Sequence, residues 1–214
     1  MWKIICVALC VGGGFCPAAD MKILFAENFS SGLTNGWANS AFFKKPSAYF
    51  VVGEGTNCCV HGVAEKTCSA LIRKLDLLPP GKLTLRWRWK ISGVETNGSE
   101  RNLKQFDHAA RVFIAFDTFI GPPRTLNYLW GNAEKAGTVL AHPKSERAQI
   151  FALESGNARA GQWVSESRDV TADWKKVFPD REMPKIVGVG LMTDSDSLGS
   201  RLEGFYAAVE LLAE

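Results

Sequence analysis

The chain has 214 residues, of which 46% are hydrophobic and 22% are charged, and this globular composition excludes an intrinsically disordered protein. The formal net charge of +3 at pH 7 is too small to indicate a nucleic-acid-binding protein. A chain of this length fits one large domain and can bury a core without metals or disulfides.

The first nineteen residues differ in character from the rest of the chain. A basic start at Lys3, an apolar run from Ile4 to Phe15 and small residues at Ala18 and Ala19 follow the pattern of a secretory signal peptide. The apolar run is short for a bilayer span, so an N-terminal membrane anchor is the lesser alternative. We predict a signal peptide over residues 1–19 and a single domain over residues 20–214. The mature domain, which has no integral membrane segment, is expected in the periplasm or outside the cell.

Three of the six cysteines, Cys58, Cys59 and Cys68, remain after removal of that segment. Neighbouring residues on a strand point to opposite faces, so at most one of Cys58 and Cys59 is expected to bond Cys68. The alternative is that all three are buried thiols without a bridge. Zinc is disfavoured because no ligand-spaced Cys or His pair is present.

Short runs of alternating hydrophobic and polar residues recur between clusters of Gly, Pro, Asn and Ser. They predict an all-β fold, a two-sheet antiparallel, jelly-roll-like β-sandwich with one short helix. The helix is expected from Thr171 to Phe178, with Asp169 or Thr171 as its cap. Residues 92–108 and 131–147 are expected to be long loops. The expected strands are Tyr49–Val52, Cys58–Ala64, Ser69–Leu75, Leu83–Ile91, Ala109–Asp117, Leu126–Trp130, Gln149–Leu153, Trp163–Val170, Ile186–Thr193 and Phe205–Leu212.

Two of these strands carry the strongest functional pattern. Each alternates between an apolar face and a face with basic side chains. If the two strands are neighbours in one sheet, burial of the apolar faces fixes their register and brings the polar faces together. The shared outward face would then contain Arg86, Arg88, Lys90, Arg111, Phe113 and Asp117. Such a face is either solvated sheet surface or a ligand site that prefers anionic saccharides, because Arg binds carboxylates and hydroxyls in fixed geometry and an aromatic ring covers a sugar.

Three further groups of residues have a pattern with both a functional and a structural interpretation. Tyr128 and Trp130 share one side of a strand and are either sugar-stacking rings or core. Asp194 and Asp196 are candidate calcium ligands in a loop, although the acid that a helix-loop-helix site needs at its twelfth position is Phe205. Glu166 and Arg168 share a strand face, where burial would require them to pair or to find other partners. A structural ion pair is expected, with a general acid or base as the alternative for the carboxylate.

The ordered set of short motifs resembles the bacterial domain-of-unknown-function family 3047, whose members are exported proteins. The resemblance implies a periplasmic or extracellular jelly-roll-like sandwich and implies no activity. The matching pieces are Phe29, Gly36-Trp37, Ser69-Ala70-Leu71, Leu85-Arg86-Trp87-Arg88-Trp89, Asp107-His108-Ala109-Ala110-Arg111-Val112, Tyr128-Leu129-Trp130-Gly131, Glu154-Ser155-Gly156, Trp163, Arg168-Asp169-Val170, Asp173 and Met192-Thr193-Asp194-Ser195-Asp196.

The sequence therefore favours a non-catalytic binding module for a glycan, with no catalytic residue assigned. The ligand-binding residues are expected among Arg86, Arg88, Arg111, Phe113, Asp117, Tyr128 and Trp130. The alternatives are a polysaccharide-degrading hydrolase or lyase, and a structural or assembly component of the cell envelope.

Overall fold

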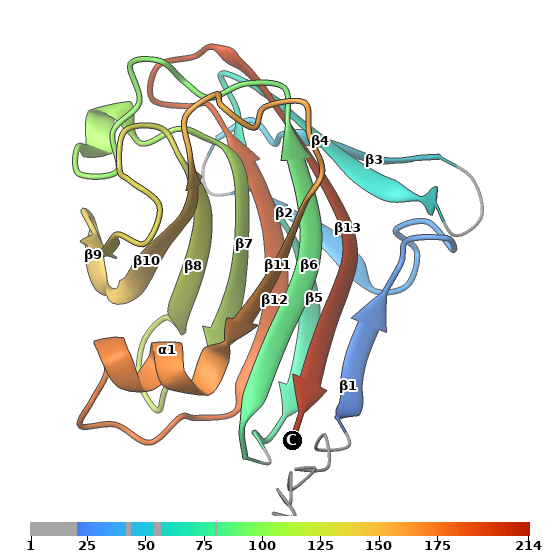
Figure 1. Ribbon diagram of the computed structural model, residues 1–214, viewed down its shortest axis with the longest axis vertical. Coiled ribbons are helices and arrows are strands. Elements are labelled where there is room, and N and C mark those ends of the chain that lie inside the picture. The colour runs from blue at the N-terminus through green and yellow to red at the C-terminus, as the bar shows by residue number, and fades with distance from the viewer. Residues whose placement is uncertain (1–20, 42–43, 54–56, 80) are drawn as a thin grey trace, which may run out of the picture.

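The computed structural model describes residues 21–41, 44–53, 57–79 and 81–214, so the expected signal peptide lies outside the described residues. Two β-sheets pack face to face, and one short helix lies at one end of the sandwich (Figure 1). The predicted two-sheet sandwich with a single short α-helix is confirmed for this part of the chain. None of the helices in the described ranges has the length and apolarity needed to cross a bilayer.

Sheet A contains six strands within the described ranges, in the order β11-β6-β13-β4-β3, and β1 also pairs with β13. All of its strand pairs are antiparallel. The strand β13 therefore joins β1, β4 and β6, although it comes last in the sequence. The strands are β1 (Lys22–Glu27), β3 (Ala48–Val52), β4 (Cys59–Glu65), β6 (Leu83–Ile91), β11 (Val164–Asp169) and β13 (Arg201–Ala213).

Sheet B contains seven strands among the described residues, in the order β2-β5-β12-β7-β8-β10-β9. Its pairs are antiparallel except β8 and β10, which run parallel and so depart from the antiparallel sandwich that the sequence predicts. The 3-10 helix η2 (Leu103–Gln105) precedes β7. The strands are β2 (Trp37–Ala41), β5 (Cys68–Leu77), β7 (His108–Phe116), β8 (Arg124–Gly131), β9 (Val139–His142), β10 (Ser145–Ser155) and β12 (Ile186–Asp194).

The core forms between the two sheets from the inward residues of each strand. On β6 the alternation is the one predicted, because every second side chain from Leu83 to Ile91 is buried. Two of these side chains cross to sheet B: the ring of Trp87 lies 5.3 Å from that of Tyr128, and Trp89 lies 5.8 Å from Trp130, measured between centroids. Large aromatic rings thus fill the space between the sheets.

The expectation that β6 and β7 are neighbours in one sheet is wrong. The strand β6 lies between β11 and β13 in sheet A, whereas β7 lies between β12 and β8 in sheet B. Their apolar faces both point into the core, from opposite sides. The polar faces consequently point to opposite surfaces of the sandwich, and the six residues expected on one face are divided between two.

The helix α1 (Val170–Val177) forms where the sequence predicts it. The carboxylate of Asp169 caps it by accepting a hydrogen bond from the Ala172 amide at 2.9 Å, which is the preferred role of Asp at a helix N-terminus. Its buried Trp174 packs against Phe116 of β7 with ring centroids 4.6 Å apart. Pro179 follows directly, in line with its expected role as a stop.

Glycine lets the two sheets approach closely at one end of the sandwich. A Cβ atom at Gly204 of β13 would lie 2.2 Å from the carbonyl oxygen of Ala109 in β7. Beside this contact, the hydroxyls of Thr193 and Tyr206 lie 2.7 Å apart, and Thr193 donates to the same Ala109 carbonyl at 2.9 Å. A buried polar cluster therefore joins sheet A to sheet B only because residue 204 has no side chain.

Candidate functional site

The outward basic side chains of β6 lie on the outer face of sheet A. Arg88 is exposed, and Arg86 and Lys90 are partly exposed. The other half of the predicted face, Arg111 and Phe113, lies on sheet B and is buried, with 6% and 8% of each residue exposed.

Two of the predicted ligand residues are placed elsewhere by packing. The ring of Phe113 covers Gly190 of β12, where an added Cβ would come within 2.1 Å of it. Asp117 follows the end of β7 and lines a separate cavity near α1. Neither residue is close to Arg88, because both belong to the sheet B side of the sandwich.

A row of aromatic and cationic side chains crosses the outer face of sheet A at right angles to the strands. Phe50, His61, Phe205 and Lys90 are successive register partners on β3, β4, β13 and β6. The imidazole of His61 stacks on Phe205 with centroids 4.2 Å apart and planes at 13°, and the Lys90 ammonium lies 4.3 Å from the Phe205 centroid. Phe50, which is 43% exposed, meets the edge of His61 at 4.8 Å. We call these four residues the aromatic row.

An open cavity of about 210 Å³ lies next to the aromatic row on the same face. The guanidinium carbon of Arg88 lies 5.2 Å from the centroid of the Trp163 ring, and both side chains line the cavity. Lys90 also lies 5.4 Å from that ring, so Trp163 connects the cavity to the row. The remaining lining residues are Asn28, Asn57, Cys58, Cys59, Ala207 and Ala208.

A β-bulge in β13 shapes this cavity. The register between β13 and β6 shifts after Ala207, and Ala208 adopts a left-handed φ of 50°. Bulges of this kind bend a strand and redirect neighbouring side chains, and they are common beside functional sites. The small side chains of Ala207 and Ala208 leave room next to Arg88 that a larger residue would fill.

A hydrogen bond orients the imidazole in the aromatic row. Nε2 of His61 lies 2.8 Å from Oε2 of Glu203, and the other oxygen of this carboxylate, Oε1, accepts a hydrogen bond from Nε of Arg201 at 2.8 Å. Burial opposes ionisation of Glu203, but the hydrogen bonds from His61 and Arg201 outweigh it and lower the pKa of this carboxyl group. The row therefore has a fixed anion, Glu203, at the edge of its imidazole and a cation, Lys90, above its phenyl ring.

Sequence reasoning found Arg88 in this site but missed Trp163, Phe205, His61 and Phe50. Alternation could have placed each of them on an outward face, because Val164, Tyr206, Val60 and Tyr49 next to them are core residues. The order of strands across the sheet, which brings them together, has no local sequence signal.

Tyr128 and Trp130 are core residues, which is one of the two possibilities that the sequence leaves open, and they are not surface rings that could stack on a sugar. Both are at most 1% exposed. The Tyr128 hydroxyl donates to Oδ2 of Asp173 at 3.1 Å, and Nε1 of Trp130 donates to the Gly156 carbonyl at 3.0 Å. Neither ring is available at the surface.

The two predicted calcium ligands do lie together, on the sheet B side. One ligand atom each from Asp194, Asp196 and Cys68 lies within 4.8 Å of the others. A thiol is a poor calcium ligand, and Nη2 of Arg111 already donates to Asp194 at 3.1 Å. Burial raises the pKa of the Asp194 carboxyl to about 7, with Arg111 acting in the opposite direction. The residues present fit a buried carboxylate–guanidinium pair and do not fit calcium.

The segment 92–107 is anchored by carboxylates that sequence reasoning did not single out. Glu100 is fully buried and accepts hydrogen bonds from the amides of Asn132, Ala133 and Glu134. Asp107 accepts from the amides of Ser197 and Leu198. These two acids therefore tie three loops together at one end of the sandwich, which is a structural role.

Glu166 and Arg168 do not form an ion pair with each other but find other partners, which is the second possibility that the sequence leaves open. Arg168 forms a two-pronged ion pair with Asp173, in which its Nε donates to Oδ2 at 3.0 Å. Glu166 instead accepts from Nε1 of Trp89 at 3.2 Å. Burial, and next the charge of Glu154, raises the pKa of the Glu166 carboxyl group to about 7. A catalytic role for Glu166 requires such a raised pKa, and it stays a prediction.

All three described cysteines are buried free thiols, which agrees with the unbridged alternative. Cys59 begins β4 in sheet A, and Cys68 begins β5 in sheet B after the turn at the far end of β4. Burial raises the pKa of the Cys68 thiol to about 12.

The fold and the outer face of sheet A describe a β-sandwich domain with a cavity on one sheet. The chain belongs to the family described as "Protein of unknown function (DUF3047)", whose model matches residues 35–210. The resemblance seen in the sequence is thus confirmed. No curated protein matches the sequence.

Several solved β-sandwich structures are distantly similar. A galactotriose complex of TmCBM61 has a TM-score of 0.44 and 12% identity, over 87% of this chain and 94% of that one. The K3 adhesin domain of Lys-gingipain from Porphyromonas gingivalis has a TM-score of 0.46 and 11% sequence identity, and the match covers 90% of this chain and 100% of that one. The CBM22-1 xylan-binding domain of Paenibacillus barcinonensis Xyn10C has a TM-score of 0.44 and 9% sequence identity, and the match covers 90% of this chain and 96% of that one.

Proposed function

We propose that the chain is a non-catalytic glycan-binding protein of the periplasm or the extracellular space, and that the ligand binds on the outer face of sheet A. The observation that carries the proposal is the cavity shared by Arg88 and Trp163, which opens beside the aromatic row. The export assignment rests on the signal-peptide pattern of residues 1–19.

The chemistry of this face suits a saccharide. An indole or phenyl ring covers the apolar C–H face of a sugar, and a guanidinium donates to hydroxyls or to a carboxylate in fixed geometry. Stacking on Trp163 restricts the Arg88 guanidinium, so less freedom is lost when a ligand binds. A chain of sugar units could extend from the cavity along the aromatic row.

The charge of the cavity favours acidic sugars. Within the described ranges, neither Arg88 nor Lys90 forms an ion pair, and both cations lie near the Trp163 ring. An unpaired guanidinium gains most from a carboxylate ligand because a charged hydrogen bond is stronger than a neutral one. We therefore expect uronate-containing glycans to bind more tightly than their neutral counterparts.

The test is binding of the protein comprising residues 20–214 to a broad glycan array, in buffer with calcium and again with a chelator. The best glycan is then titrated by calorimetry against Trp163→Ala, Arg88→Gln and the control Arg86→Gln. Arg86 is among the residues that the sequence predicts at the ligand, but it does not line the cavity, although it lies on the same face of the same strand, and it therefore serves as the control. We expect the first two variants to lose about tenfold or more in affinity, or about 1.4 kcal/mol, and the control to bind normally. A protein that binds no glycan, or variants that all bind equally, would contradict the proposal.

A polysaccharide-cleaving activity is the second candidate, and the raised pKa of Glu166 favours it. Glu154 supplies a second carboxylate whose charge acts on Glu166. Glycosidases use two carboxyl groups, one protonated near neutral pH. Incubation of each bound glycan with the protein, followed by an assay for new reducing ends, tests this candidate. Activity that is present in the wild type and absent in Glu166→Gln would favour an enzyme over a binding module.

A further inference from the structure

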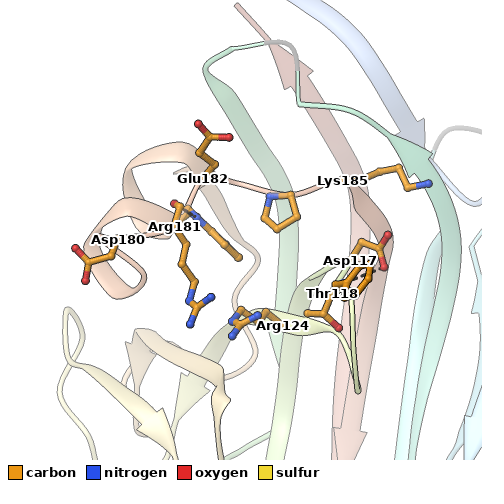
Figure 2. Close-up of a pocket in the computed structure, with 10 residues that line it drawn as sticks. Asp117, Thr118, Arg124, Asp180, Arg181, Glu182 and Lys185 are labelled. Carbon is orange, nitrogen blue, oxygen red and sulfur yellow. Dashed lines mark hydrogen bonds between the residues drawn. The ribbon is translucent and has the colours of Figure 1, made fainter.

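A second and larger open cavity, of about 510 Å³, lies at the end of the sandwich near α1. The loop after β7, the start of β8 and the segment after α1 surround it (Figure 2). Arg124 and Arg181 both point into this space, although they lie more than fifty residues apart in the sequence. It is separate from the outer face of sheet A, because it is formed on the sheet B side.

The structure positions three guanidinium groups around this end. The guanidinium carbon of Arg124 lies 5.6 Å from the centroid of the Phe178 ring. Arg147 of β10 donates from Nη1 to the Pro122 carbonyl at 3.3 Å. Two hydrogen bonds fix the backbone of Arg181. The Arg181 amide donates to the Phe178 carbonyl at 3.1 Å, and the Trp174 indole donates to the Arg181 carbonyl at 3.0 Å. We call Arg124, Arg147 and Arg181 the arginine cluster, of which Arg124 and Arg181 line the cavity and Arg147 lies beside it.

The arginine cluster has excess positive charge. In the described part of the chain none of its three members forms an ion pair with a carboxylate. The pKa of Arg124 is lowered by burial first, and then by the like charges of Arg181 and Arg147. Like charges that face one another are unfavourable unless an anion lies between or beside them.

The acidic residues of the same cavity are not ion-paired with the cluster. In Figure 2 the carboxylates of Asp180 and Glu182 point away from the guanidinium groups of Arg124 and Arg181. Asp117 lies on the far side of the cavity and accepts a hydrogen bond from the Thr118 amide at 2.9 Å. The nearby Lys185 is bonded to Asp76 at 2.8 Å. Within the described residues Asp117, Asp180 and Glu182 form no ion pair either. The cavity therefore holds separated charges, and its arginine side chains have no carboxylate partner.

We propose that the arginine cluster binds a phosphate or sulfate group. Guanidinium groups bind such oxyanions by paired charge-assisted hydrogen bonds, and three of them from separate elements supply more donors than one surface arginine. The group belongs either to a small soluble anion or to an anionic lipid headgroup. The adjoining loop presents Phe119 and Ile120, which are 103% and 75% exposed and would contact the apolar part of a lipid surface.

The first arm of the test titrates the purified protein with inorganic phosphate, and then with sulfate, at constant ionic strength set with chloride. Binding is followed by amide chemical shifts. We expect a saturable shift near β8 and the segment after α1, weakened about tenfold or more in the double variant Arg124→Gln, Arg181→Gln. The control Arg101→Gln, Arg159→Gln removes the same charge at the opposite end of β8 and β10 and should bind like the wild type.

The second arm identifies the source of the anion by sedimentation with phosphatidylcholine vesicles that contain or lack phosphatidylglycerol. Binding that requires phosphatidylglycerol, the arginine cluster and the Phe119-Ile120 pair assigns the site to a membrane surface. Phosphate binding without vesicle binding assigns it to a soluble anion. The proposal is overturned if neither probe binds, or if the arginine double variant and its control behave alike. Trp163→Ala should leave both arms unchanged, so failure here is distinguishable from failure of the glycan proposal.

Discussion

Tyr128 of β8 donates a hydrogen bond to Asp173 of α1 over 3.1 Å, in the interior where the ring is fully buried. The same carboxylate forms the ion pair with Arg168. Removal of the Asp173 side chain therefore leaves two polar groups without their partner. We expect Asp173→Ala to lower the free energy of unfolding by about 2 to 3 kcal/mol, and Tyr128→Phe by about 1 kcal/mol. Urea denaturation of both variants measures these free energies of unfolding. An equal loss in the two variants would show that the ion pair between Arg168 and Asp173 contributes nothing to stability.

The close approach at Gly204 gives a sharper test of the sandwich. An added methyl group would clash with the Ala109 backbone carbonyl, which cannot rotate away as a side chain could. We expect Gly204→Ala to lower the free energy of unfolding by about 3 kcal/mol. Gly93→Ala is the control, because the nearest atom to its added Cβ is 3.4 Å away. Similar denaturation midpoints for the two variants would mean that the sheets are further apart than described.

The raised pKa of Glu166 makes stability depend on pH. Its pKa is about 7 in the folded protein, against an ordinary value of 4.5. The folded state therefore binds the proton more tightly than the unfolded state does. The stability that protonated Glu166 contributes is fully present below about pH 4.5 and is lost as the pH rises to about 7. Glu166→Gln keeps an acceptor for the Trp89 indole without the charge. We expect the free energy of unfolding of this variant to exceed that of the wild type by about 1 kcal/mol at about pH 8 and to equal it near pH 4; the figure allows for the partial exposure of residue 166.

Thermal unfolding of both proteins across this pH range provides the measurement. Asp194, whose pKa is also about 7, titrates in the same window. The slope of stability against pH should therefore become smaller in the Glu166→Gln variant without disappearing. Identical slopes would show that Glu166 is ionised in the folded protein at neutral pH.

Burial of the cysteines predicts slow chemistry with thiol reagents. The protein comprising residues 20–214, prepared without reductant, should release three equivalents of chromophore from Ellman's reagent in denaturant. In the native protein the Cys68 thiol should react far more slowly than in denaturant, because burial raises its pKa to about 12 and leaves it protonated at neutral pH. A single equivalent in denaturant would instead indicate a disulfide between two of the three.

The sequence predicts which residues face inward better than it predicts which strands are neighbours. On β6 the alternation correctly assigns Trp87 and Trp89 to the core and Arg88 to the surface. The same rule applies to β7, yet the two strands lie in opposite sheets. Alternation is a local property of each strand, whereas pairing depends on contacts that are distant in sequence, such as Gly204 with Ile91. Short strands with few alternating residues, such as β1, β2 and β9, were missed for lack of a local pattern.

The same distinction explains the candidate site. Arg88 was selected because its own strand alternates clearly. Trp163 lies just before β11, and Phe205 lies on β13, whose neighbouring strands the sequence does not reveal. No local pattern therefore connects either residue with Arg88. Buried charge was also hard to anticipate: Arg111 was expected on an exposed face, but it is buried beside Asp194 and over the ring of Phe106.

The position of β13 has a consequence for biosynthesis. This strand pairs with β1, β4 and β6, yet the ribosome makes it after all of them. Until it is available, the nascent chain carries three strands whose hydrogen-bonding edges have no central partner, and such edges are prone to associate with other chains. Sheet A consequently closes around its last strand, so a chain cut short before residue 201 would lack the element that joins its two halves.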